Sequence, residues 1–403
     1  MELMKRLTME EWEKKYIVEP IKRMDQKNIG FNRSRWDTTP IGEKSFKEFG
    51  HEFFGLVMPR EKAGYTLQDR ALGDVSWWLE LGFAEGNAMG QTGLFAWDSK
   101  LMGPSRLPEG LKIEISDPQK LTRDIKNVAT YFAADLVGVC EFDRRWLYTN
   151  YYNLRTREYG PLEIPEEYKY AIVMAHEMDY ELEKYAPTRI ADGATGMGYS
   201  KMAFTAGLLA QFIRELGYKA IPNGNDTTMS IPMAMQAGLG ELSRSGLLIT
   251  KEYGPRVRIS KVLTDLPLVV DQPIEFGVTE FCSKCGLCAE HCPGQAIIHG
   301  ERTIEPHNVS NVRGELKWPV DAEKCFRFWA INGAPCCVCI RVCPFNKHMN
   351  WFHRITLGFV DHARWGDSFY RKMDGMLGYG KQKKAEDFWD TWRPRQALRI
   401  TQK

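Results

Sequence analysis

Nine of the ten cysteines in this 403-residue chain lie within a stretch of only 62 residues, 282–343. The first four begin at Cys282 and follow the spacing C-x2-C-x2-C-x3-C-P, which is typical of thiolates that hold [4Fe–4S] clusters. A disulfide framework is instead found in small secreted chains, and zinc sites use separate C-x2-C pairs. The cysteine pattern therefore predicts iron–sulfur ligation.

A second run, C-x2-C-x3-C-P, begins at Cys336 and supplies only three cysteines. Cys325, eleven residues upstream, is the candidate for the missing ligand. In two-cluster modules the last cysteine of such a run binds the other cluster. The spacing thus predicts two [4Fe–4S] clusters that carry single electrons, and it leaves Cys140 and Cys337 unassigned. The predicted ligand sets are Cys282, Cys285, Cys288 and Cys343 for one cluster, and Cys292, Cys325, Cys336 and Cys339 for the other.

Charge and hydropathy exclude several classes of protein. The 54 Lys and Arg nearly balance the 52 Asp and Glu, so a net charge of +2 gives no electrostatic case for a nucleic-acid partner. The longest apolar runs fall short of the ~18 residues that a membrane span needs. The first eleven residues are charged and lack the apolar segment of a secretory leader. We expect neither nucleic-acid binding nor a transmembrane span in this chain.

Periodicity predicts an α/β core in the middle of the chain. A helix is expected to begin at Pro118 with Asp117 as its N-cap, and a second apolar helical stripe runs over 202–216. Short apolar runs at 136–140, 170–175 and 219–221 are expected strands. The predicted division is an irregular aromatic-rich unit over 1–115, the α/β core over 116–274, a ferredoxin-like 2[4Fe–4S] module over 275–349 and a tail over 350–403.

Other chemical motifs are weak. His176 begins like H-E-x-x-H, but Tyr180 stands where the second histidine should be, so we interpret His176 as structural. The glycines near 193–198 and 238–240 do not make a dinucleotide or phosphate loop. The aromatic stretch 77–97 is interpreted mainly as core, with a substrate pocket as the alternative.

Four motifs occur in a fixed order before the cysteine runs, and with those runs they resemble the catalytic subunit of respiratory reductive dehalogenases. They are Gly193-Ala-Thr-Gly-Met-Gly-Tyr199-Ser200, Pro222-Asn-Gly-Asn225-Asp226, Ala237-Gly-Leu-Gly-Glu-Leu-Ser-Arg244 and Tyr253-Gly-Pro255. The chain looks most like members that act on small chlorinated alkanes such as chloroform and trichloroethane. The resemblance implies a nitroreductase-like core that binds a base-off corrinoid.

The resemblance also implies roles for single residues. Tyr199 matches the proton donor, Asn225 and Arg244 match its supporting polar pair, and Thr195 matches a pocket-lining position. A guanidinium suits this role because it keeps its charge and favours a neighbouring phenolate. The remaining expected corrinoid contacts are Ser200, Gly238, Gly240 and Ser243.

The implied reaction removes halide from a small organohalide with two electrons and one proton, in anaerobic organohalide respiration. The resemblance implies a small membrane-anchor subunit and a peripheral place on the outer face of the cell membrane. The chain departs from the family by lacking a twin-arginine leader, so either the leader was removed or the protein is cytoplasmic.

Two alternative functions remain open from the sequence. An epoxyqueuosine reductase would share the corrinoid core and the clusters, but it would need a basic surface for tRNA. A ferredoxin-type electron-transfer subunit would not need the roughly 280 residues that precede Cys282.

Overall fold

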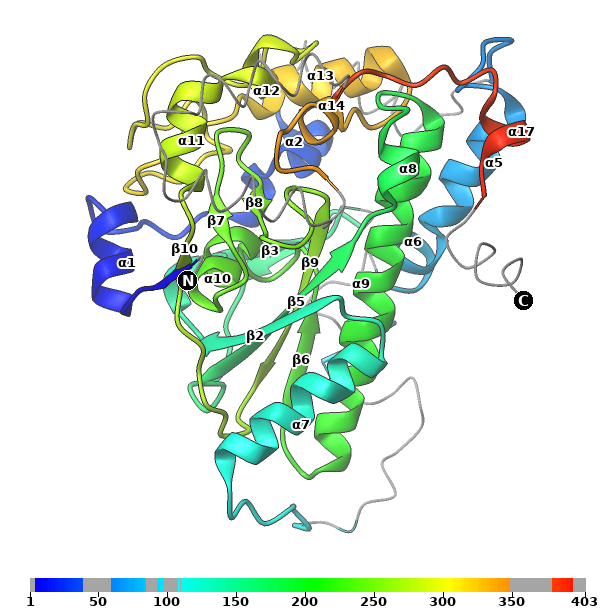
Figure 1. The fold of residues 1–403 in the computed structure, drawn as a ribbon. Helices are drawn as coiled ribbons and strands as arrows, with labels where there is room; N and C mark the ends of the chain where they lie inside the picture. Colours follow the sequence, from blue (N-terminus) through cyan, green and yellow to red (C-terminus); the bar gives the residue numbers. More distant parts are fainter. Residues whose placement is uncertain are drawn as a thin grey trace.

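The computed structural model describes residues 4–38, 59–84, 93–97, 108, 110–154, 156–347 and 379–393, and Figure 1 shows their arrangement. A four-stranded sheet forms the centre in the order β2-β5-β9-β6, and each neighbouring pair is antiparallel. The strands are β2 (Leu136–Glu141), β5 (Tyr170–Glu177), β6 (Ala220–Asn223) and β9 (Val257–Thr264). The first three were predicted, whereas β9 was missed because Arg258 and Lys261 interrupt its apolar pattern.

Helices cover both faces of this sheet (Figure 1). Side chains alternate along a strand, so β5 sends Ile172 and Met174 to one face and Ala171 and Val173 to the other. The first face packs against α7 (Pro118–Tyr131) and α9 (Arg189–Glu215), and the second packs against α10 (Ser230–Gln236). The predicted cap is present, since the Asp117 side chain accepts from the backbone of α7. α9 begins before the predicted stripe and therefore carries the whole 193–200 motif.

The cysteine-rich module lies at one end of the sheet (Figure 1). It contains α11 (Val278–Cys285), α12 (Leu287–Glu290), α13 (Ala322–Asn332) and α14 (Val338–Arg341). A short hairpin, β7 (Glu241–Leu242) with β8 (Leu248–Ile249), reaches from the core towards it. Arg256, which precedes β9 and is buried, joins core and module by bonding Glu177 at 3.0 Å and the Lys347 carbonyl at 2.9 Å.

The described residues of the expected N-terminal unit lie in different places. Residues 4–38 contact both the cysteine module and the core: β1 (Lys5–Arg6) pairs with β10 (Ile274–Glu275), Arg33 of α2 (Gly30–Trp36) bonds Glu323 at 2.7 Å, and Arg23 bonds the Leu147 carbonyl at 2.9 Å. By contrast, α5 (Leu67–Ser76) and α6 (Trp78–Phe83) pack on α9. Residues 4–38 are therefore held in place by ion pairs as well as by buried apolar side chains.

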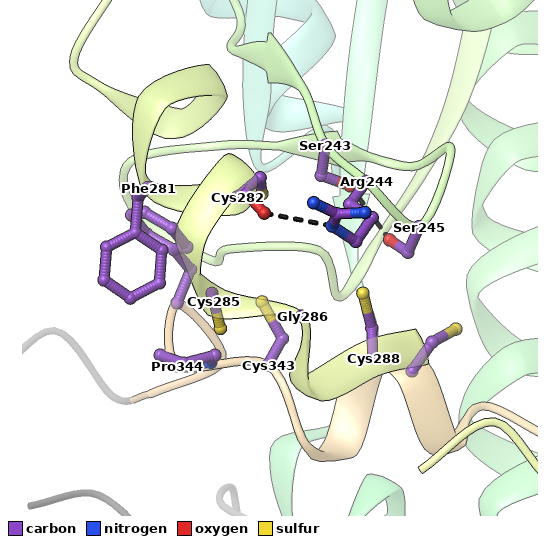
Figure 2. A pocket seen from close by; sticks show the side chains of 12 residues that line it. Ser243, Arg244, Ser245, Phe281, Cys282, Cys285, Gly286, Cys288, Cys343 and Pro344 are labelled. Carbon is purple, nitrogen blue, oxygen red and sulfur yellow. Dashed lines mark hydrogen bonds between the residues drawn. The ribbon is translucent and has the colours of Figure 1, made fainter. Parts of the chain in front are cut away.

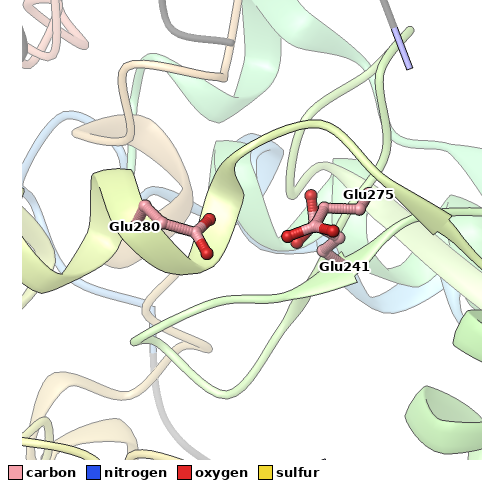
Figure 3. A group of neighbouring side chains, drawn as sticks. All are labelled: Glu241, Glu275 and Glu280. Carbon is pink, nitrogen blue, oxygen red and sulfur yellow. The ribbon is translucent and has the colours of Figure 1, made fainter. Parts of the chain in front are cut away.

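Three carboxylates, Glu241, Glu275 and Glu280, gather as Figure 3 shows. They lie beside α1 (Met9–Tyr16). The Lys15 ammonium lies among them, 2.6 Å from Glu275, 3.5 Å from Glu241 and 3.6 Å from Glu280. Burial lowers the pKa of Lys15, but the surrounding negative charges more than reverse this and raise it overall. The cluster is therefore an ion-pair network that attaches α1 to the cysteine module.

The remaining described elements are short. They are the single helical turns η1 (Gln26–Asn28) and η5 (Arg144–Trp146), the hairpin β3 (Asn150–Tyr152) with β4 (Tyr159–Pro161), α8 (Tyr180–Glu183) and α17 (Phe388–Thr391). The buried Phe388 packs on Tyr185, so this part of the predicted tail covers the region near α8. The rest of that tail lies outside the described residues.

The mixed α/β fold and its C-terminal cluster module match the prediction. His176 is structural, as expected: it is buried in β5, its Nε2 lies 2.9 Å from Ser260 Oγ, and burial lowers its pKa to about 3. Among the described helices, none has both the length and the apolar character needed to cross a bilayer.

Candidate functional site

One pocket in the module brings together the first predicted ligand set. Cys282, Cys285, Cys288 and Cys343 line it, with the hairpin turn of Ser243–Ser245 on its other side (Figure 2). Gly286, in the left-handed region at φ 67°, separates α11 from α12 and turns the chain between Cys285 and Cys288. This turn lets closely spaced cysteines line the same pocket.

The second predicted set also gathers in space. Cys325 is half-buried, and besides desolvation the groups that raise the pKa of its thiol are Cys339, Cys336, Cys292 and Asp321, in that order. The three cysteines among these groups are the ones that the sequence spacing assigns to the same cluster as Cys325. Cys339 also lines the first pocket, so the two sets adjoin there. The assignment of individual cysteines to the two clusters remains a prediction.

Burial sets the chemistry of these thiols. It raises the pKa of Cys282 and of Cys336 to about 12, and it raises the pKa of Cys343 as well. Iron binds the thiolate, so cluster binding must displace protons from these sulfurs. Two groups of buried and half-buried cysteines fit two cubane clusters.

The predicted proton donor lies on α9. Tyr199 stacks on Trp77 at 4.6 Å between ring centroids, and its hydroxyl oxygen accepts a hydrogen bond from Asn225 Nδ2 at 2.9 Å. Asn225 follows β6 on the loop that leads to α10. The structure therefore brings together the predicted phenol and amide, and it adds an indole from the aromatic stretch.

The guanidinium beside this phenol belongs to Arg258 of β9. Its Cζ lies 5.2 Å from the centroid of the Tyr199 ring. Burial lowers the pKa of Arg258, but Tyr199 and other negative neighbours raise it overall, so the group keeps its charge. Its Nε is buried and has no hydrogen-bond partner among the described residues. Arg258 therefore offers a fixed positive charge beside Tyr199 and an N–H donor that the described chain does not use.

Arg244 corrects the prediction that an arginine at this position supports Tyr199, because it lies in the β7–β8 turn and faces the cluster module. Its guanidinium donates to the carbonyls of Cys282 at 3.0 Å, Ile298 at 2.9 Å, Gly300 at 2.9 Å and Ser283 at 3.3 Å. It also stacks over Trp318. Figure 2 shows this side chain on the β7–β8 turn with its bond to the Cys282 carbonyl. The four contacts give Arg244 a structural role.

The other expected corrinoid contacts have partners within the chain. Thr195, one turn before Tyr199, has its Oγ1 3.2 Å from Cys337 Sγ, and Ser200 donates to the Ser76 carbonyl at 2.6 Å. Ser243 bonds within its own turn, to the Leu247 carbonyl at 2.8 Å.

Close backbone packing accounts for the two glycines. A Cβ at Gly238 would lie 2.5 Å from the Gln272 carbonyl oxygen, and one at Gly240 would lie 2.1 Å from that of Ile249. Neither position has room for a side chain, whatever else binds nearby. A corrinoid contact at either glycine stays a prediction.

Two side chains near Tyr199 have buried polar atoms that a large polar cofactor could bond. Both carboxylate oxygens of Glu183 are buried without a hydrogen-bond partner among the described residues, as is Arg258 Nε. Burial raises the pKa of Glu183 to about 8, and Arg258 is the first of the charges that oppose this. A carboxyl and a guanidinium that lack partners fit the amide side chains at the edge of a corrinoid.

Sequence reasoning missed Arg258. The available signal was a charged residue between the apolar Val257 and Ile259 in a run of strand-like pattern. An arginine in such a run whose Nε is buried requires a partner or a ligand, which points to a functional position.

Comparisons with known proteins identify the family of the chain. Residues 281–346 match the family of 4Fe-4S double cluster binding domains. Tetrachloroethene reductive dehalogenase of Sulfurospirillum multivorans is 36% identical over 83% of this chain and 73% of its own length. The enzyme of the same name from Desulfitobacterium hafniense is 33% identical over 83% and 74%.

Solved structures give the same result for the fold. A reductive dehalogenase whose structure suggests a mechanism for B12-dependent dehalogenation superposes with a TM-score of 0.70 at 26% identity. The match covers 95% of this chain. A catabolic reductive dehalogenase in complex with 3-bromo-4-hydroxybenzoic acid gives 0.69 at 25% identity and 95% coverage. This chain spans about half the length of these two proteins, 50% and 49%.

Proposed function

Since the chain belongs to the reductive dehalogenase family, we propose that it removes halide reductively from a small organohalide. The single observation that carries the proposal is the contact of Tyr199 with Asn225 and Arg258, next to a module with two sets of four cysteines. The reaction takes two electrons and one proton and converts the carbon–halogen bond into a carbon–hydrogen bond and free halide. Each requirement has a candidate group in the chain.

The cofactors of the proposed enzyme are two [4Fe–4S] clusters and a base-off corrinoid. When bound, the clusters supply electrons one at a time and the corrinoid supplies a strongly reducing cobalt centre. The two cysteine sets would hold the clusters. Thr195, Glu183 and Arg258 would hold the corrinoid. Thr195 Oγ1 lies 3.2 Å from Cys337 Sγ, and Glu183 and Arg258 are charges that act on the same thiol.

The proton would come from the Tyr199 hydroxyl. As the proton leaves, negative charge develops on the phenol oxygen, and the Asn225 N–H already points at that oxygen. The guanidinium of Arg258 stabilises the same charge without being able to donate a proton itself. Trp77, stacked on the ring, holds the phenol in place.

The test is Tyr199→Phe, which removes one oxygen and keeps the ring. We expect iron and cobalt contents equal to those of the wild type, with dehalogenation reduced at least ~100-fold, the lower range for a positioned acid. Halide release with a reduced viologen as electron donor measures the loss. Near-normal turnover with full cofactor loading would reject the proton-donor role.

The substrate class can be proposed more narrowly. We propose a small chlorinated alkane such as chloroform or trichloroethane, on the resemblance of the sequence motifs. The curated relatives act on chloroethenes, which are equally small chlorinated compounds. Parallel assays with chloroform, trichloroethane and tetrachloroethene distinguish the two. Turnover of tetrachloroethene alone would reject the alkane.

The partner and the location are also proposals. A small membrane-anchor subunit would hold the protein at the outer face of the cell membrane, as the resemblance implies. Fractionation of native cells tests this, and a purely cytosolic pool would contradict it. The tRNA-modifying and ferredoxin-type alternatives are not favoured, because the matches to reductive dehalogenases extend over 83% of the chain.

A further inference from the structure

A buried lysine lies beneath the loop that carries Asn225. Lys261 stands in β9, opposite Asn223 of β6 and Val173 of β5, and it has no exposed surface. Its Nζ donates to the Gly224 carbonyl, to the Thr228 carbonyl at 3.1 Å and to Ser230 Oγ at 2.8 Å. All three acceptors belong to the segment 224–230, so one ammonium fixes the loop on both sides of Asn225.

The chemistry of an ammonium gives this contact a direction. An ammonium has three N–H donors and no acceptor, and it meets three oxygen acceptors here. Burial lowers the pKa of Lys261 to about 7, and three acceptors around its Nζ favour the charged form. In that form Ser230 Oγ accepts from Lys261, and its own hydrogen is directed to Asn225 Oδ1 at 3.1 Å. Because that amide oxygen is the acceptor, the NH₂ end of Asn225 faces the Tyr199 oxygen at 2.9 Å.

We propose that Lys261 and Ser230 are positioning residues that set the direction of a hydrogen-bond chain ending at Tyr199. The chain runs from Lys261 through Ser230 and Asn225 to the phenol. This inference rests on the proposed role of Tyr199 as the proton donor. Neither positioning residue touches the reacting atoms.

The direction matters because the two ends of an amide have nearly the same shape. With its N–H towards Tyr199, Asn225 stabilises the oxygen that becomes negative when the proton leaves. With the amide reversed, a carbonyl oxygen would face that developing charge and oppose it. The lysine thus selects the productive one of two orientations of similar shape.

Other contacts of the loop do not fix the amide. Asp226 accepts from the Gly224 N–H at 2.7 Å and from Thr227 Oγ1 at 2.8 Å, which shapes the turn. Thr228 Oγ1 donates to Asn223 Oδ1 at 3.1 Å. Among the described residues, the hydrogen bonds that reach the Asn225 side chain are those with Ser230 and Tyr199.

The experiment compares Ser230→Ala with Ser230→Thr, which keeps the hydroxyl, and with Thr228→Val as the matched control. Thr228→Val removes a hydroxyl of the same loop that does not contact Asn225. Each protein is fully loaded with iron and labelled with ¹³C at the tyrosine Cζ. The NMR signal that is missing from Tyr199→Phe identifies Tyr199, and its position reports the hydrogen bond to the phenol without any need for turnover.

We expect Ser230→Ala to shift the Tyr199 signal and to lower kcat about tenfold with KM within about twofold, the effect of one hydrogen bond. Ser230→Thr should restore both values, and Thr228→Val should change neither. Ser230→Ala with an unmoved signal would overturn the inference, and so would an equal shift in Thr228→Val. If Tyr199→Phe itself turned over normally, the proposed function would fail, while the NMR shift would still decide the orientation of Asn225.

Discussion

Two arginines, the buried Arg244 and the half-buried Arg258, show how the module side and the phenol side of the molecule differ. Arg244 donates to four backbone carbonyls and stacks on an indole. Arg258 lies over the Tyr199 ring, and its Nε has no hydrogen-bond partner among the described residues. The first arginine has its donors satisfied by the chain itself, whereas the second keeps a donor for another molecule.

The difference teaches how to separate structural from functional charge. A buried charge costs free energy unless it is paired, and the fold offsets that cost fully at Arg244. At Arg258 the cost is only partly offset, which is expected where a substrate or cofactor completes the set of contacts. The same contrast holds for Glu183, a buried acid whose carboxylate oxygens have no hydrogen-bond partner among the described residues.

The largest expected effect is the loss of electron delivery through the cysteine module. Cys325→Ser removes the ligand that stands outside both runs, so we expect about half of the iron to be lost. Dehalogenation should fall more than ~1000-fold, because electron delivery stops while the proton donor stays intact. Iron and acid-labile sulfide analysis of anaerobically prepared protein measures the first effect. A variant that kept all its iron would remove Cys325 from the ligand set.

The next effect concerns the phenol side. Arg258→Gln removes a fixed charge beside Tyr199 and leaves the cysteines untouched. Loss of one preorganised charge of this kind costs ~100- to 1000-fold in kcat, and we expect that range here, with normal iron content. Halide release at saturating substrate is the measurement. Activity within about threefold of the wild type would mean that Arg258, like Arg244, is only structural.

Arg244→Gln should give the opposite result. It leaves several buried carbonyls of the module without a donor, so we expect a loss of ~2 to 4 kcal/mol in the free energy of unfolding. Thermal unfolding and retention of iron during purification measure this. The iron-loaded fraction should turn over within about twofold of the wild type. Inactive but fully loaded protein would restore Arg244 to the catalytic site and end the contrast.

These two sides also differ in how far the sequence could predict them. The cysteine sets follow from spacing, because ligands a few residues apart are placed by the local turn, and only Cys325 had to be inferred. Tyr199 and Asn225 came from the motif resemblance, and their contact is present. Arg258 depends on the register of β9 against β5, which no local pattern encodes. The motif resemblance points to Arg244 as the arginine beside the phenol, because Arg244 is the last residue of its motif. The β7–β8 turn instead directs the Arg244 side chain to the cluster module.

The smallest effect tests how closely Arg258 must be positioned. A Cβ at Gly198 of α9 would lie 2.9 Å from Arg258 Cγ and 3.2 Å from Met178 Cγ, so Gly198→Ala must displace flexible side chains. We expect kcat to fall about three- to tenfold, because a guanidinium moved by a few tenths of an ångström still faces the phenol. Gly193→Ala is the matched control on the same helix, since its Cβ would meet Leu72 at 3.0 Å and not Arg258. If both variants lost activity equally, the cause would be the packing of α9, and the position of Arg258 would not limit the rate.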